Sequence, residues 1–244
     1  MDTTRDAVGR TNRRPSSRAP RRILVRVNLD AARDRAARAA VAHIENGMTV
    51  GLGSGDTAAR AIRFLGERRL DIVGVATSER AAALARSVGI IVRAPDDVPA
   101  IDITIDGADE LDDALRIIKG GGAAHTREKL VARASRQLII VADAGKRVHR
   151  LGEHMPLPIE ILPFGGEWTM ARLRGIGLEP RVREGIVSDN GNLIVDCPLA
   201  AGVDVRALAA AIKAQAGVVE HGFFLDEASL AYVGNENGVE HLSR

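Results

Sequence analysis

Four short segments combine glycine, hydroxyl, carboxylate and amine groups in ways that could serve chemistry. They are Gly51–Thr57 (GLGSGDT), Asp106–Glu110 (DGADE), Lys119–Gly122 (KGGG) and Asp143–Lys146 (DAGK). Each begins within or directly after a short apolar run that is typical of a β-strand. Ligands bind outside the carboxyl ends of the strands in open α/β sheets, so we expect the four segments to share one crevice.

The first segment, Gly51–Thr57, is a glycine-rich turn between an expected strand and an expected helix. It is not a dinucleotide fingerprint, whose third glycine would fall at Asp56, and no Gly-Lys-Ser/Thr follows to make it a Walker A loop. Glycines let the backbone approach a ligand, and helix N-terminal amides favour an anion. With the hydroxyls of Ser54 and Thr57 as further donors, the turn indicates either a phosphate site or a plain tight turn capped by Asp56.

The second segment, Asp106–Glu110, holds three acids that repel one another, so their pKa values should be perturbed if they are buried. These oxygens could bind a divalent metal, or Asp109 could simply cap a helix. The next loop brings a lysine rather than further oxygen ligands, which disfavours the metal.

The third segment places Lys119 before three glycines, whose amides would make a cationic, donor-rich cradle for a developing oxyanion. Lys119 could instead only pair with Asp106 or Asp109. Glu128, in the first turns of the following helix, could project into the same crevice or remain a solvated surface acid. Lys146 is the last candidate at a strand end.

Strands and helices alternate in the elements that must position these groups, which predicts a parallel sheet covered on both faces. We expect Ser78 to cap a helix and Gly89 to end it. The pattern predicts helices over 31–45, 57–68, 78–88 and 124–135, and strands over 48–52, 71–76, 90–92, 101–105, 115–118 and 137–142.

Past Gly152 the pattern changes to that of a small α+β unit with an antiparallel sheet, while 230–233 is too short to stand alone and is expected to return to the first domain. The predicted domains are a basic tail (1–22), a large domain that carries the four candidate segments (23–151 plus 227–244) and a small domain (152–226). Within the small domain we expect strands over 159–162, 179–183, 186–188, 192–195 and 218–225, and helices over 167–175 and 204–214.

The composition is that of an ordinary globular protein, with 45% apolar and 27% charged residues among 244. No apolar run approaches the roughly 18 residues that cross a bilayer, and the N-terminus lacks the apolar core of a secretory signal. The single cysteine, Cys197, allows no internal disulfide and is expected to be an inert buried thiol. We therefore expect a cytoplasmic protein with no membrane contact.

The basic character of the chain comes from its first residues. Seven arginines against two aspartates give residues 1–22 a net charge of +5, so in a chain of net +2 the remainder sums to −3. The segment has no aromatic residue for base stacking. We expect a disordered, solvated extension and no nucleic-acid partner, while the basic tail leaves contact with nucleic acid or an acidic surface open.

Taken together and in order, the segments resemble type A ribose-5-phosphate isomerase. The resemblance covers about residues 31–244. The motifs that carry it are GLGSGDTA, TSER, DGADELDDALRIIKGGGAAHTREKLVA, DAGK, MPLPIEILPF, EPRVREGIVSDNGNLIVD and GNENGVE.

The resemblance implies a metal- and cofactor-independent aldose–ketose isomerase of the pentose phosphate pathway. It implies a Rossmann-like domain with an inserted ferredoxin-like α+β domain, assembled as a homodimer or homotetramer. Its substrate is a phosphosugar, D-ribose 5-phosphate, converted to D-ribulose 5-phosphate and back. One carboxylate can move the proton between C2 and C1 through a cis-enediolate.

By motif, Glu128 is the acid/base, Lys119 and Asp106 assist it, and Asp109 is the least defined member of the catalytic set. Asp106 is assigned to ring opening and proton transfer between O1 and O2. The residues implied to line the substrate site are Ser54, Gly55, Asp56, Thr57, Asp106, Gly107, Ala108, Asp109, Lys119, Gly120, Gly121, Gly122 and Lys146.

Three positions depart from the family pattern. Asp56 replaces a hydroxyl in the phosphate turn, and we expect it to turn away as a helix cap because an anion would repel phosphate. Arg33 stands where the family often has lysine and is expected to be a surface arginine, although it could attract phosphate. His125 replaces an apolar residue and is assigned no role.

Two other functions stay open from the sequence. The chain could be a non-catalytic module that senses sugar phosphates, although such a sensor needs neither Glu128 nor Lys119. It could also isomerise a different phosphosugar, because sequence indicates pocket size poorly.

Overall fold

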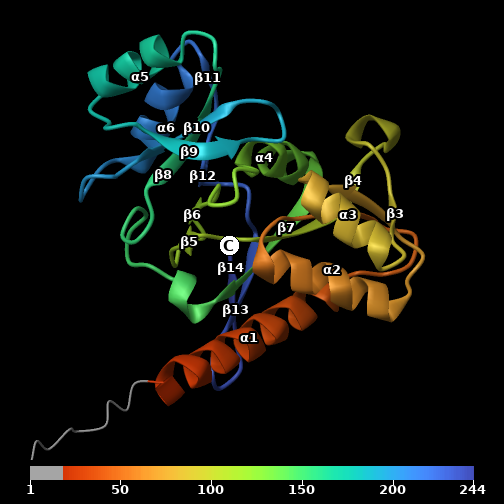
Figure 1. Ribbon diagram of the computed structural model, residues 1–244. Helices are drawn as coiled ribbons and strands as arrows, with labels where there is room; N and C mark the ends of the chain where they lie inside the picture. The colour runs from red at the N-terminus through yellow and green to blue at the C-terminus, as the bar shows by residue number, and fades with distance from the viewer. Residues whose placement is uncertain (1–18) are drawn as a thin grey trace, which may run out of the picture.

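A computed structural model describes residues 19–244, with side chains described from residue 29 onward. Figure 1 shows a large domain built on a central sheet and a smaller domain beside it, with helix α4 (His125–Ala134) between the two. Residues 1–18 of the predicted basic tail lie outside the described residues, and residues 19–22 belong to helix α1 (Ala19–Val41).

The central sheet has seven strands in the order β14-β13-β7-β4-β1-β2-β3. All neighbours are parallel except the terminal hairpin β13–β14, so the predicted parallel sheet is confirmed and one antiparallel edge strand is added. The strands are β1 (Thr49–Leu52), β2 (Val73–Ala76), β3 (Ile91–Val92), β4 (Ile101–Gly107), β7 (Ser135–Asp143), β13 (Leu230–Gly234) and β14 (Val239–Ser243).

Alternate side chains of these strands pack on opposite faces of the sheet, as the pleat requires. Ile139 and Val141 face helices α1, α2 (Asp56–Arg68) and α3 (Glu79–Ser87), whereas Ile140 faces the side on which α4 lies. Both faces are covered, which is why strand β7 carries the continuous apolar run Leu138–Ala142.

Helix boundaries in the large domain follow local signals. The Ser78 side chain accepts a hydrogen bond from the Ala81 amide at the start of α3, and Gly89 follows the helix end with a φ of 86°. Both predictions are confirmed. Helix α1 ends at Val41 rather than at residue 45, before a turn in which Gly47 takes a φ of 84°.

The small domain has the order β11-β8-β10-β9, entirely antiparallel, with two helices. This β-α-β-β-α-β chain order is ferredoxin-like, as predicted. Its elements are β8 (Leu157–Ile161), α5 (Gly166–Gly175), β9 (Arg181–Val187), β10 (Leu193–Cys197), α6 (Val205–Lys213) and β11 (Val218–His221).

Strand β9 is continuous, so the prediction of two strands over 179–183 and 186–188 was wrong. Gly185 takes a φ of 70° inside the strand, where the register with β10 shifts. An irregularity of this kind bends a strand without ending it.

A third sheet joins the two domains, in the order β12-β6-β5. Strand β12 (Phe223–Phe224) leaves the small domain and pairs with β6 (Ile117–Ile118), which pairs in turn with β5 (Glu110–Leu111). The sequence did not reveal β5. This sheet matters for the site because β6 runs directly into Lys119.

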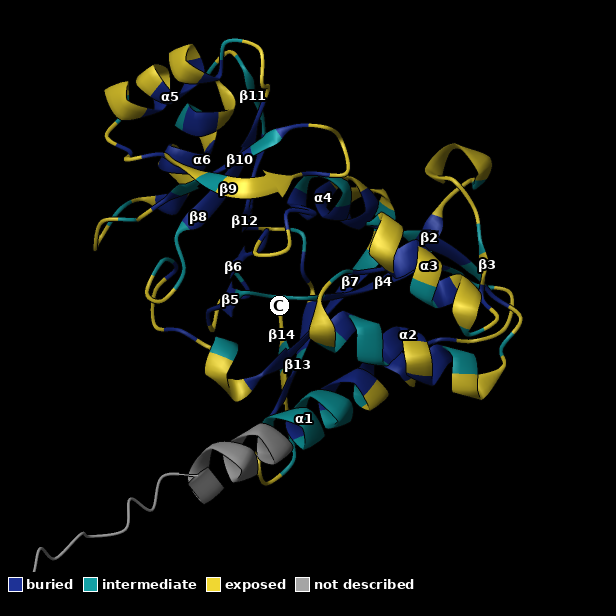
Figure 2. Cartoon of the chain, in the orientation of Figure 1, coloured by how far each residue is buried: buried dark blue, intermediate teal, exposed yellow. Residues whose placement is uncertain are grey.

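Apolar cores fill each domain, and buried polar groups gather where the domains meet. Figure 2 shows the central strands as buried and the outward faces of the helices as exposed. Cys197 is fully buried in the small-domain core, which confirms its predicted burial, and burial raises its pKa to about 12, in keeping with an inert thiol. Within residues 19–244 no helix is both long enough and apolar enough to cross a membrane.

Candidate active site

Three neighbouring parallel strands, β1, β4 and β7, bring their carboxyl ends to one edge of the sheet, and their loops meet there. With the glycine loop that follows β6 and the start of α4, these loops enclose a cavity of about 180 Å³. The residues that line it are Arg33, Ser54, Gly55, Asp56, Thr57, Gly107, Ala108, Asp109, Lys119, Gly120, Gly122, Glu128 and Lys146. All but Arg33 were proposed from the sequence.

Glu128 projects from the first turn of α4 into this cavity and is only 4% exposed, so it is not a solvated surface acid. Its Oε2 atom accepts no hydrogen bond from the described residues. Burial, followed by repulsion from Asp106, raises its pKa to about 8. A buried carboxyl group with a free oxygen and a pKa near neutrality is suited to taking and returning a proton.

Lys119 lies between two carboxylates. Its Nζ is 3.1 Å from Asp106 Oδ1 and 3.4 Å from Glu128 Oε2, and it also donates to the Gly107 carbonyl at 2.5 Å. Burial opposes its charge, but Asp106 and Glu128 outweigh burial and raise its pKa, so it remains an ammonium group. A fixed positive charge therefore sits beside the base.

Asp106 is buried behind the cavity wall and holds the site together through one oxygen. Its Oδ1 accepts from the amides of Ser54 (3.0 Å) and Gly107 (2.7 Å) as well as pairing with Lys119. Gly53 makes this packing possible, because a Cβ there would lie 2.2 Å from Oδ1 and 2.5 Å from the Asp106 Cα. A glycine is required at this position by close approach.

The glycine loop is shaped by Asp109, which does not cap a helix. Asp109 Oδ2 accepts a hydrogen bond of 2.6 Å from the Gly121 amide, so that amide is not available to an oxyanion. Among the described residues the Gly122 amide has no protein acceptor, and Gly122 lines the cavity. Lys119 and the Gly122 amide are thus candidate donors for a developing negative charge, and the Gly120 amide, also on the cavity wall, likewise has no acceptor among the described residues.

The opposite end of the cavity suits a phosphate. Helix α2 begins there with Gly55 as its N-cap at a φ of 91°, and no side chain caps the first-turn amides. The Ser54 hydroxyl instead bonds the hydroxyls of Thr77 (2.8 Å) and Ser78 (2.7 Å). Lys146 brings positive charge from the 3₁₀ turn η2 (Ala144–Lys146).

Two expectations about this end need correction. Asp56 turns outward, with its carboxylate 73% exposed and 3.9 Å from Arg80, but it caps nothing, because it occupies the first turn of α2 while Gly55 is the N-cap. Arg33 is not a plain surface arginine. Its Nε bonds Asp143 Oδ2 at 2.8 Å, and it lines the cavity because α1 packs against β7.

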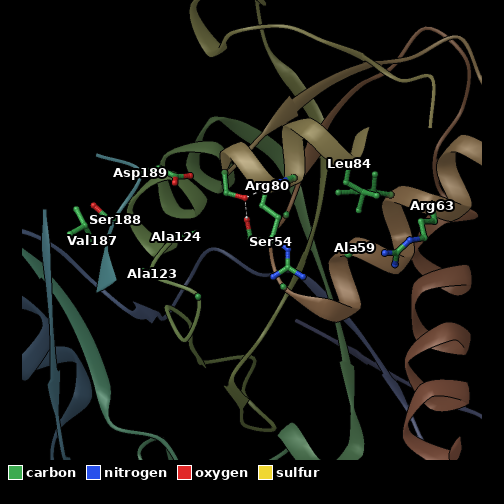
Figure 3. A pocket seen from close by; sticks show the side chains of 16 residues that line it. Ser54, Ala59, Arg63, Arg80, Leu84, Ala123, Ala124, Val187, Ser188 and Asp189 are labelled. Carbon is green, nitrogen blue, oxygen red and sulfur yellow. Dashed lines mark hydrogen bonds between the residues drawn. The ribbon is translucent and has the colours of Figure 1, made fainter. Parts of the chain in front are cut away.

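A second cavity of about 260 Å³ adjoins the first and shares Ser54, Gly55 and Gly122 with it. Figure 3 shows Ser54 and Arg80 from the large domain on one side and Ser188 and Asp189 from the small domain on the other. The crevice therefore continues between the domains.

Helix α4 is tied to the small domain by buried polar contacts that sequence reasoning missed. Thr126 Oγ1 donates to Glu160 Oε2 at 2.5 Å, and Lys129 Nζ pairs with Glu220 Oε1 at 2.9 Å. His125 is buried, its Nε2 lies 3.3 Å from the Glu220 carbonyl, and burial lowers its pKa to about 4. The polar residues of α4 do not by themselves indicate these buried contacts, because the partners lie on strands that are distant in the sequence.

Among the described residues, no group of three or more His, Cys, Asp or Glu side chains is arranged to hold a metal ion. The expected independence from metals and cofactors stays a prediction.

Comparisons with known proteins agree with this geometry. The family model described as "Ribose 5-phosphate isomerase A (phosphoriboisomerase A)" matches residues 73–238. Ribose-5-phosphate isomerase A from Thermomicrobium roseum is 50% identical over 222 residues, which are 87% of this chain and 94% of that protein. The corresponding protein of Roseiflexus castenholzii is 46% identical over 86% of this chain and 94% of its own.

Solved structures are similar over the same range. Ribose 5-phosphate isomerase A from Methanocaldococcus jannaschii has a TM-score of 0.84 at 35% identity, covering 88% of this chain and 99% of that one. A D-ribose-5-phosphate isomerase in complex with phospho-erythronic acid has a TM-score of 0.86 at 36% identity, covering 89% and 100%.

Proposed function

Because the chain belongs to the ribose 5-phosphate isomerase A family, we propose that it interconverts D-ribose 5-phosphate and D-ribulose 5-phosphate through a cis-enediolate, as in the non-oxidative pentose phosphate pathway. The observation that carries the proposal is Glu128, a buried carboxyl group with a pKa of about 8 whose free Oε2 lies beside an ammonium group.

The proton transfer needs one base. Glu128 as carboxylate removes the C2 proton of the open-chain aldose, and the electrons of that C–H bond form the C1–C2 double bond while the carbonyl oxygen becomes negative. Once the O2 proton has moved to O1, the protonated Glu128 returns its proton to C1 on the same face, which leaves the carbonyl at C2. A positioned base of this kind contributes roughly 10²- to 10⁴-fold to the rate.

Stabilising the enediolate is the task of the groups beside the base. Lys119, 3.4 Å from Glu128 Oε2, and the amide of Gly122 supply positive potential at the developing oxygen charge. Asp106 holds Lys119 through Oδ1, while its Oδ2 accepts no hydrogen bond from the described residues. We assign that second oxygen to ring opening and to proton transfer between O1 and O2.

The phosphate contributes binding energy remote from the reaction. We place it against the first-turn amides of α2, with Thr57, Lys146 and Arg33 around it. Anchoring there holds C1 and C2 at the acid–base centre.

A coupled assay of ribulose 5-phosphate formation tests the proposal on wild type and Glu128→Gln. We expect the substitution to lower kcat at least about 100-fold with little change in KM, since it removes the base and keeps the shape of the side chain. Glu79→Gln is a matched control, because Glu79 is an exposed acid whose partner Arg127 lies outside the cavity.

Two outcomes would contradict the proposal. A wild-type protein that binds ribose 5-phosphate without converting it would indicate a sensing module, and turnover only of another phosphosugar would indicate a different substrate. Homodimer or homotetramer assembly remains a prediction, which sedimentation of the wild type would test.

A further inference from the structure

Arg183, on strand β9 of the small domain, reaches across to the glycine loop of the active site. Its Nη1 donates to the carbonyls of Gly120 (2.9 Å) and Gly121 (3.0 Å). Its Nε and Nη2 form a two-pronged pair with the carboxylate of Asp196 on β10, at 2.9 and 2.5 Å. This pairing fixes the plane of the guanidinium group.

Binding the two carbonyls also fixes the direction of the amides that follow them. In a planar trans peptide, the C=O of one residue and the N–H of the next point to opposite sides of the chain. The N–H paired with the Gly120 carbonyl belongs to Gly121 and reaches Asp109 Oδ2, which lies on the cavity wall. The side away from Arg183 is therefore the cavity side.

The next peptide, between Gly121 and Gly122, is held in the same way. Arg183 is the only described group that bonds the Gly121 carbonyl, and the N–H of that peptide belongs to Gly122, which lines the cavity and has no protein acceptor. Glycines resist peptide rotation less than any other residue, because they have no Cβ. The Ala123 amide donates to the Gly120 carbonyl at 3.0 Å, and a turn closed by this bond can hold its central Gly121–Gly122 peptide in either of two orientations. Arg183 selects one of them by binding the Gly121 carbonyl.

We propose that Arg183, held by Asp196, is a positioning residue that keeps the Gly122 amide directed at the developing enediolate oxygen. The inference rests on the proposed isomerase function and adds to it a contribution of the small domain to transition-state stabilisation. The guanidinium charge on the carbonyl also polarises the peptide, which strengthens its N–H as a donor.

The test compares Arg183→Gln with Arg181→Gln, a control on the same strand whose side chain is 76% exposed and faces Glu179. Loss of one oxyanion donor costs about 10²- to 10³-fold in kcat, and a donor that is misdirected only part of the time should cost about 10- to 100-fold. We expect that fall in kcat for Arg183→Gln with KM within about threefold of wild type, and no change for Arg181→Gln.

Two ligands distinguish positioning from a general loss of structure. Phospho-erythronic acid carries a charged planar carboxylate that resembles the planar enediolate, whereas ribitol 5-phosphate has no planar centre. In Arg183→Gln the inhibition constant of the acid should rise by the same factor as kcat falls, while that of ribitol 5-phosphate should stay within about threefold. Asp196→Asn, which only loosens the guanidinium group, should change kcat and the inhibition constant of phospho-erythronic acid less than Arg183→Gln does. Arg183→Lys should retain part of the kcat that Arg183→Gln loses.

An unchanged kcat in Arg183→Gln would overturn the proposal, as would equal weakening of both inhibitors together with a lower melting temperature. If wild type fails to isomerise ribose 5-phosphate, the proposed function fails. Selective weakening of phospho-erythronic acid binding in Arg183→Gln, measured by calorimetry, would still support the positioning role of Arg183, because it does not depend on turnover.

Discussion

At the scale of single residues, the chemistry depends on charges that oppose one another within a few ångströms. Burial and Asp106 push the pKa of Glu128 up, and Lys119 pulls it down. A base must be deprotonated to act, so a pKa of about 8 places its working range at and above neutrality rather than in acid.

This balance predicts the pH dependence of the reaction. We expect kcat/KM for ribose 5-phosphate to rise about tenfold per pH unit up to an apparent pKa near 8 and then to level off. In Lys119→Met the rising part of the kcat/KM profile should move to higher pH, because the cation that lowers the pKa of Glu128 is gone. The same substitution should lower kcat about 10²- to 10³-fold. A wild-type kcat/KM that levels off already near pH 5 would contradict this prediction.

Asp56 gives a second prediction at this scale. Its carboxylate is exposed, 3.9 Å from Arg80, and points out of the phosphate turn, so solvent and the arginine screen its charge. Asp56→Ser should therefore lower KM for ribose 5-phosphate by no more than about threefold. Steady-state kinetics at low and high salt would measure this, and a tenfold change in KM would show that the charge reaches the phosphate.

At the scale of elements, the turn between β1 and α2 shows what a glycine-rich segment is for. Gly53 and Gly55 are two residues apart but have different reasons to be glycine. A Cβ at Gly53 would collide with Asp106, whereas at Gly55 nothing lies within 4 Å and only the φ of 91° is unfavourable.

Alanine substitutions should separate these two causes. Gly53→Ala should displace Asp106 and with it Lys119, so we expect kcat to fall at least about 100-fold with a clear loss of stability. Gly55→Ala should cost about 1 kcal/mol of backbone strain. Urea unfolding and kinetics of both variants test the distinction, which fails if the two behave alike.

How far the sequence predicts these elements depends on how local their causes are. The parallel sheet follows from continuous apolar runs such as Leu138–Ala142, and the start of α3 follows from Ser78, because both signals lie within the segment. Strand β5 and the terminal strand β14 have no such signal and form only because partners from elsewhere pair with them.

The site divides in the same way. Loops at strand ends must meet at one edge of the sheet, so Ser54, Asp106 and Lys146 could be grouped from the sequence. Arg33, Arg183 and Glu160 could not, because their roles arise from a helix crossing and from contacts between domains that no local pattern encodes. The predicted helix cap at Asp56 was wrong by one position, since Gly55 is the N-cap of α2, and sequence patterns do not locate a helix start to a single residue.

At the scale of the whole molecule, the two domains share buried polar contacts. Glu160 of β8 is fully buried and accepts hydrogen bonds from Thr126 of α4 and from three side chains of the small domain, Ser188, Asn190 and Asn192. Burial opposes its charge, but these hydrogen bonds outweigh burial and lower its pKa. Unfolding the large domain alone would remove the Thr126 hydrogen bond from this buried carboxylate and would also break the buried ion pair of Lys129 with Glu220.

We therefore expect one cooperative thermal transition for wild type, with equal calorimetric and van't Hoff enthalpies. Glu160→Gln can keep an acceptor oxygen toward Ser188, Asn190 and Asn192, but it removes the negative charge and puts an NH2 donor where Thr126 now finds an acceptor. We expect a cost of about 2 kcal/mol, which lowers the melting temperature by roughly 5 °C. Glu167→Gln, on the exposed side of α5, is the control. Two separate transitions in wild type would contradict this coupling.

The return of the chain to the central sheet has a consequence for synthesis. Every proposed catalytic side chain has left the ribosome once Lys146 has emerged, yet β13, which completes the sheet beside β7, begins only at Leu230. Lys129 of α4 likewise cannot form its buried ion pair until Glu220 has been synthesised. A nascent chain thus carries its full catalytic set long before it can organise it, and a polypeptide that ends between Lys146 and Leu230 would hold every proposed catalytic side chain without the strand that completes the sheet.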